Sequence, residues 1–260
     1  MIGDANLDAS SPVLMRLGPS VAVITLQRPD LANALQPEDV IRILDHLDTL
    51  ESDPVMRCLI LTGSGTVFSA GFDLRSLAEV AGKGGAEFAR MVDRVEGSRL
   101  FTLAALNGPA IGGAADLALA CDMIVAARNS VFVMAYSGIA LSPDGGGSWS
   151  LSRAVPRQLA TELLMCGERI GAERLQQLGV VNRLTDAGQA LDEALKLADQ
   201  INARAPNALA SIKELLSDAD DSTLNAQLAR ERDHFVKNLH HNNAGIGIAA
   251  FLNKQKPQYE

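Results

Sequence analysis

Apolar residues in the first two thirds of the chain form short runs that alternate with helical patterns. The runs of strand length are 13–17, 21–26, 58–62, 102–106, 123–126 and 131–134. A Gly-Pro-Ser turn between the first two runs predicts a hairpin. The apolar spacing is helical over 37–50 and 86–99. Strands that alternate with helices predict an α/β fold with crossover connections.

The last third of the chain has a different pattern, because its apolar residues recur almost only at helical spacing. The predicted helices are 191–204, 208–216, 224–239 and 246–252. We therefore expect two parts, an α/β core over residues 1–200 and a helical region over residues 201–260.

Two glycine turns follow predicted strands. Ala70-Gly71-Phe72 comes after the run at 58–62, and Gly112-Gly113-Ala114 comes after the run at 102–106. Glycine lets the backbone approach a ligand closely, and a helix that starts there adds the positive end of its dipole. Both turns are therefore candidate sites for a developing negative charge, although a tight strand-to-helix joint explains either one alone.

Composition narrows the possible functions. A net charge of −8 and a pI near 5.1 argue against broad binding to nucleic acids or anionic membranes. The three cysteines, Cys58, Cys121 and Cys166, lack metal-ligand spacing and are typical of thiols in a reducing compartment. The first residues lack a signal-peptide pattern, and no apolar run has membrane-spanning length. We expect a cytoplasmic protein without a metal site.

Several segments, in the same order, resemble the signature of the crotonase superfamily of enoyl-CoA hydratases and isomerases. They include Phe68-Ser69-Ala70-Gly71-Phe72-Asp73-Leu74, Asn107-Gly108-Pro109-Ala110-Ile111-Gly112-Gly113 and Ser142-Pro143-Asp144-Gly145-Gly146-Gly147. The stretch from 133 to 165 is similar to a subgroup that is associated with phenylacetate catabolism and labelled alternative oxepin-CoA hydrolase.

The resemblance implies a spiral of ββα units as the acyl-CoA-binding core. The helical C-terminal region would serve oligomerisation and close the CoA site. It also implies a homotrimer or a dimer of trimers, and coenzyme A as part of the substrate thioester, with no permanently bound cofactor.

The resemblance also assigns residues. The two backbone donors of the family's oxyanion hole fall on Phe72 and Gly113, where they would stabilise a thioester enolate. The expected substrate contacts are Leu31, Ala70, Gly71, Asp73, Leu74, Gly112, Tyr136, Trp149, Phe251 and Lys254. For Lys254, a solvated lysine near the chain end is the alternative, and for Trp149 it is core packing.

The acid and base positions depart from the hydratase pattern. The two glutamates of family hydratases fall on Asp116 and Tyr136, whereas Asp144 matches the position of the catalytic acid in several family isomerases. We expect Asp144 to transfer the proton, with a helix N-cap as its structural alternative. Asp116 either positions water or pairs with a helix dipole. Tyr136 is expected to form a pocket wall or donate a hydrogen bond.

These residues predict an enoyl-CoA hydratase or isomerase with Asp144 as the acid/base. The first alternative is enoyl-CoA hydration, or ring hydrolysis of the oxepin-CoA type, with Asp116 positioning water. The alternative from another class is a non-catalytic homologue that binds CoA or RNA.

Overall fold

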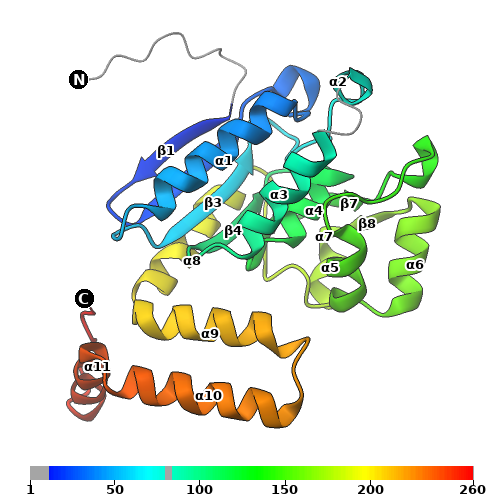
Figure 1. Cartoon of the computed structure of the whole chain (residues 1–260). Coiled ribbons are helices and arrows are strands. Elements are labelled where there is room, and N and C mark those ends of the chain that lie inside the picture. Colours follow the sequence, from blue (N-terminus) through cyan, green and yellow to red (C-terminus); the bar gives the residue numbers. More distant parts are fainter. Residues whose placement is uncertain (1–11, 80–83, 260) are drawn as a thin grey trace. The chain divides into compact units, whose positions relative to one another are not determined.

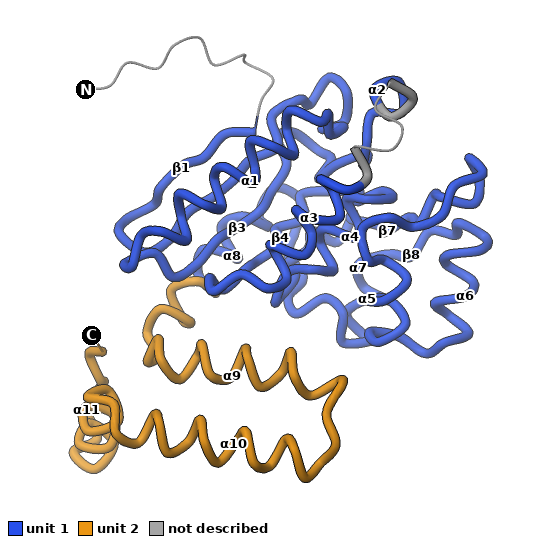
Figure 2. Tube along the Cα trace, viewed as in Figure 1, with its two compact units in different colours: residues 1–196 blue, residues 197–260 orange. Residues whose placement is uncertain are grey.

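The computed structural model describes residues 12–79 and 84–259. The chain divides into two compact units, residues 1–196 and 197–260, and the boundary lies inside the helix Ala190–Asn202 (Figure 2). Among the described residues, no helix combines the length and the apolar character needed to cross a membrane.

A six-stranded sheet forms the centre of the first unit, and its strand order is β1-β2-β3-β4-β6-β9. The strands are β1 (Val13–Leu17), β2 (Val21–Leu26), β3 (Cys58–Gly63), β4 (Phe101–Leu106), β6 (Met123–Ala127) and β9 (Arg183–Thr185). β1 and β2 form the predicted antiparallel hairpin, and every other pair is parallel. All residues of β3 are buried, as its uninterrupted apolar run predicts.

Two amphipathic helices pack against each other in front of this sheet (Figure 1). They are α1 (Pro37–Glu51) and α3 (Gly84–Glu96). The apolar face of α1 shares one hydrophobic core with alternate residues of the central strands, among them Ile24 and Leu59. α3 begins and ends earlier than the predicted range of 86–99.

A second, three-stranded sheet has the order β5-β7-β8. Its strands are β5 (Ala110–Ile111), β7 (Val131–Val133) and β8 (Arg169–Gly171). The other helices of this unit are η1 (Pro29–Leu31), α2 (Leu74–Glu79), α4 (Gly113–Leu119), η2 (Ser137–Ile139), α5 (Gly147–Ala154), α6 (Arg157–Cys166) and α7 (Ala172–Gln177). The sequence pattern missed β5, since a strand of two residues is too short for a period to be visible.

The second unit is helical, as predicted. It contains the end of α8 (Ala190–Asn202), and then α9 (Pro206–Ala219), α10 (Leu224–Leu239) and α11 (Asn242–Leu252). α10 contacts both α9 and α11 within this unit (Figure 2).

Candidate active site

The first glycine turn is held by Leu35, which pairs with Phe72 in an isolated parallel bridge. The Leu35 amide donates to the carbonyl of Gly71 at 2.7 Å, and the Asp73 amide donates to the carbonyl of Leu35 at 2.8 Å. In a parallel bridge, one residue bonds to the two neighbours of its partner. The amide of Phe72 itself is therefore directed away from Leu35.

The second glycine turn joins the short strand β5 to helix α4. The Ile111 amide donates to Ser69 at 3.0 Å, and the Gly112 amide donates to Val133 of β7 at 2.8 Å. Gly113 is the first residue of α4, so its amide has no acceptor within the helix. This amide lies at the positive end of the helix dipole.

The two turns lie directly against each other. A Cβ atom at Gly71 would lie 2.6 Å from the Ile111 carbonyl oxygen and 3.4 Å from the Gly113 nitrogen, and Gly71 has a φ of +83°. Only glycine fits both the conformation and the space. Within residues 12–79 and 84–259, neither the Phe72 amide nor the Gly113 amide has a hydrogen-bond acceptor. The structure thus brings together two donors that are far apart in the sequence.

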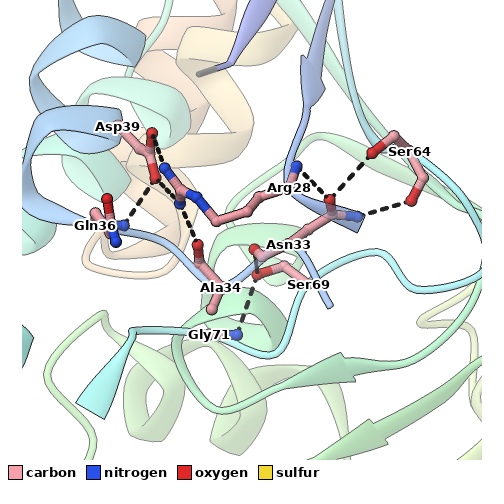
Figure 3. A network of polar contacts seen from close by, with 8 residues as sticks. All are labelled: Arg28, Asn33, Ala34, Gln36, Asp39, Ser64, Ser69 and Gly71. Carbon is pink, nitrogen blue, oxygen red and sulfur yellow. Dashed lines mark hydrogen bonds and ion pairs between the residues drawn. The ribbon is translucent and has the colours of Figure 1, made fainter. Parts of the chain in front are cut away.

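A polar network around Asn33 fixes the first turn (Figure 3). Asn33 has a left-handed φ of 54°, and its side-chain amide donates to the carbonyls of Ser64 and Val67 at 2.9 and 2.8 Å. The Ser69 hydroxyl donates to the Asn33 carbonyl at 2.7 Å and accepts from the Gly71 amide at 3.1 Å. Side-chain hydrogen bonds therefore stabilise the turn that contains Phe72, in addition to the isolated bridge with Leu35.

An ion pair closes the other end of this network. Arg28 contacts Asp39 at 2.6 Å and also donates to the carbonyl of Ala34 at 2.7 Å. Asp39 accepts from the amide of Gln36 as well, which caps the start of α1. The loop between β2 and α1 is thereby held in one conformation over the turn (Figure 3).

One aromatic ring contacts both turns from inside the core. Phe88 of α3 is fully buried and meets the Phe72 ring edge to face, with centroids 4.9 Å apart. A Cβ atom at Gly113 would lie 2.8 Å from the same Phe88 ring, and one at Gly145 would lie 2.4 Å from it. Phe88 therefore supports Phe72, Gly113 and the segment that follows Asp144.

Asp116 and Tyr136 form a buried pair beside these turns. The Tyr136 hydroxyl donates to Asp116 Oδ2 at 2.5 Å, and Asp116 is 0% exposed. Burial raises the pKa of Asp116 to about 6, with a smaller contribution from the charge of Asp144 and against the lowering effect of the Tyr136 hydroxyl. Burial also raises the pKa of Tyr136, and the carboxylate of Asp116 adds to this effect. The phenol therefore stays protonated and acts as a donor.

Asp144 lies at the protein surface, in the segment that leads into α5. Helix α5 begins at Gly147 and has Gly146 as its N-cap, so the N-cap alternative for Asp144 is wrong. Partial burial of the Asp144 carboxyl raises its pKa above the ordinary value of 3.8. A carboxylate with a raised pKa is a stronger base, which suits proton transfer.

The remaining sequence-predicted contacts divide between the two units. Leu31, Leu74 and Trp149 are exposed side chains of the first unit, and Arg153 stacks on the Trp149 ring with its guanidinium carbon 4.1 Å from the ring centroid. Ala70, Asp73 and Gly112 are half-buried within or beside the two turns. Phe251 is exposed on α11 of the second unit, and Lys254 follows it with a left-handed φ of 55°.

Sequence reasoning missed the residues that support the turns. Phe88 occupies an apolar position on an amphipathic helix, where nothing separates it from ordinary core residues. Ser69 lies within the motif from Phe68 to Leu74, but its hydrogen bond to the Asn33 carbonyl joins residues 36 positions apart. Such a contact leaves no local signal in the sequence.

Comparison with known proteins places this chain in one family. The model of the enoyl-CoA hydratase/isomerase family matches residues 16–260. The 1,2-epoxyphenylacetyl-CoA isomerase of Escherichia coli (strain K12) is 33% identical over 257 residues, covering 95% of this chain and 97% of its own length. The 2,3-dehydroadipyl-CoA hydratase of the same organism is 31% identical, covering 92% of this chain and 95% of its own length.

Solved structures agree with this placement. The crystal structure of an enoyl-CoA hydratase from Polaromonas sp. JS666 is 50% identical to the chain and has a TM-score of 0.92, covering 96% of this chain and 100% of that one. The chain belongs to the enoyl-CoA hydratase/isomerase family and is an acyl-CoA enzyme of that family. The resemblance to the crotonase superfamily and the mixed α/β fold that it implies are thereby confirmed.

Proposed function

We propose that the protein isomerises enoyl-CoA thioesters, with Phe72 and Gly113 binding the thioester oxygen and Asp144 moving the proton. The observation that carries this proposal is the meeting of two glycine turns whose amides lack an acceptor in the described part of the chain. Two such donors stabilise the negative charge of an enolate. Loss of one donor of this kind typically costs about 3 to 4 kcal/mol in the transition state.

The proton transfer follows from the chemistry of an unsaturated thioester. In a 3-enoyl-CoA, the Asp144 carboxylate removes a proton from the α-carbon, and the electron pair moves into a dienolate whose oxygen is held by the two amides. The same carboxyl then returns the proton to the γ-carbon. The product is the 2-enoyl-CoA, and Asp144 is again ionised.

The substrate contacts also remain proposals. The CoA moiety would lie along Leu31, Ala70, Asp73 and Leu74, close to the first turn. Tyr136 and Trp149 would border the acyl group, and exposed Trp149 suits an aromatic or ring-derived acyl chain. The relative named 1,2-epoxyphenylacetyl-CoA isomerase supports a ring-derived substrate of this kind.

Hydration is the second candidate, and the raised pKa of Asp116 favours it. A carboxyl with a pKa of about 6 can act as an acid or base near neutral pH, and a hydratase is among the relatives. Asp116 would then position a water molecule for addition to the β-carbon. Full burial of this carboxyl makes hydration the weaker candidate.

A homo-oligomer completes the proposal. Four apolar side chains on α10 are at least half exposed and recur on one helix face, namely Leu224, Leu228, Phe235 and Leu239. A row of this kind is typical of a buried interface. We therefore propose that copies of the chain associate through α10, as a trimer or a dimer of trimers.

The test of function uses the purified protein with a 3-enoyl-CoA and, separately, with a 2-enoyl-CoA. Isomerisation predicts conversion of the 3-enoyl to the 2-enoyl thioester, and about a 10²-fold to 10⁴-fold loss in Asp144→Asn, the range typical of an acid/base residue. Addition of water to the 2-enoyl-CoA, unaffected by Asp144→Asn, would instead assign hydration.

A further inference from the structure

The carboxyl of Asp116 has an unusual environment. It is 0% exposed, and Tyr136 binds only one of its oxygens. The other oxygen, Oδ1, is buried and has no hydrogen bond of good geometry to any described residue. A buried carboxylate with an unpaired oxygen destabilises a fold, so its position calls for an explanation beyond packing.

The backbone after Asp144 runs directly over this carboxyl. A Cβ atom at Gly147 would lie 2.1 Å from Asp116 Oδ1, and one at Gly145 would lie 3.0 Å from Oδ2. The amides of both glycines are close enough to lower the pKa of Asp116, against the larger effect of burial. Any larger residue at 145 or 147 would push this segment off Asp116.

Tyr136 ties the same carboxyl to the second glycine turn. It follows strand β7, and a Cβ atom at Gly112 would lie 4.0 Å from Tyr136 Cζ. The pair thereby links three parts of the first unit: the start of α4, the end of β7 and the segment that carries Asp144 into α5.

We propose that Asp116 and Tyr136 are positioning residues, which hold the Gly145–Gly147 backbone and so keep the Asp144 carboxyl beside the two amides, without taking part in the proton transfer. The proposal rests on the proposed function, since it assumes that Asp144 moves the proton. It assigns the two positions at which family hydratases carry glutamates a supporting role in this chain.

The test compares Asp116→Asn and Tyr136→Phe with the native enzyme, and uses Tyr259→Phe, the other tyrosine of the chain, as a matched control. We expect both pair variants to lower kcat about 10-fold to 100-fold, the effect of a displaced catalytic group, with KM nearly unchanged. Tyr259→Phe should change neither quantity.

Two results would overturn this assignment. Native kcat in both pair variants would show that the pair does not position Asp144. Loss of all activity in Asp116→Asn, to the level of Asp144→Asn, would show that Asp116 acts on the substrate itself. The proposed function fails separately, because full activity in Asp144→Asn would remove it whatever the pair variants show. Near-UV circular dichroism confirms that each variant is folded.

Discussion

Asp116 is a buried residue whose ionised form is disfavoured in the folded protein. Its pKa rises from 3.8 to about 6 in the folded protein, with burial as the main cause. The folded state therefore binds a proton that the unfolded state has released between these two pH values. Stability must fall as pH rises through this window.

The first prediction concerns Asp116→Asn, which keeps the shape and removes the charge. A rise from 3.8 to about 6 corresponds to about 3 kcal/mol at roughly 1.4 kcal/mol per pH unit. The free energy of unfolding of the variant, relative to the native protein, should increase by up to this amount between pH 4 and pH 7. Urea denaturation at fixed protein concentration measures it, and a difference independent of pH would contradict it.

The second prediction concerns Gly71→Ala. The added Cβ atom meets the Ile111 carbonyl at 2.6 Å, and the residue has a φ of +83°. We expect a loss of about 2 kcal/mol or more in stability. Displacement of the Phe72 amide should lower kcat about 10²-fold to 10³-fold. Gly18→Ala is the matched control, because Gly18 has a φ of +73° but open space around it. Equal effects on kcat would count against the two-amide site.

At the scale of elements, the site depends on two turns, the first held by an isolated bridge and the second lying between strand β5 and helix α4. The sequence located both turns, because glycines after apolar runs are a local signal. It also located strands β3 and β4, which precede the turns, but not the two-residue strand β5 that leads into the second one. It did not locate the contacts of Asn33, Ser69 and Phe88, since these join distant segments. The candidate acid/base residues were proposed through the resemblance, whereas the burial of Asp116 appears only in three dimensions.

The third prediction tests whether the Ser69 hydroxyl stabilises the first turn. In Ser69→Ala, the buried Gly71 amide and Asn33 carbonyl each lose a hydrogen bond. We expect a loss of about 2 kcal/mol in stability, and a lower kcat with nearly unchanged KM, because the Phe72 amide loses its fixed direction. Ser52→Ala, an exposed serine at the end of α1, should leave kcat unchanged. A Ser69 variant with native kcat would show that the turn holds itself.

At the scale of the whole molecule, the exposed apolar row on α10 is the surface through which we propose that copies of the chain associate. Leu224 and Phe235 are 73% and 68% exposed, which is unfavourable for side chains in water. The helical region was visible in the sequence from its period alone. Which face of α10 remains uncovered could not be read there, because a buried face and an interface face have the same pattern.

The fourth prediction is that the chain, of 27.5 kDa, elutes as a trimer or a hexamer. Leu228→Asp should shift the mass measured by light scattering toward that of the monomer, because the row on α10 then carries a charge into the interface. Ile41→Asp, an exposed apolar position on α1, is the control and should leave the mass unchanged. A native protein that is monomeric at micromolar concentration would contradict the proposed interface.

The most direct test of the central claim is a crystal structure of the native protein with a saturated acyl-CoA, such as butyryl-CoA. The account predicts that the thioester oxygen lies about 2.7 to 3.1 Å from both the Phe72 and the Gly113 nitrogen atoms. It also predicts that the Asp144 carboxyl faces the α- and γ-carbons. A thioester oxygen bound by neither amide, or a side chain lying between the two amides, would contradict it.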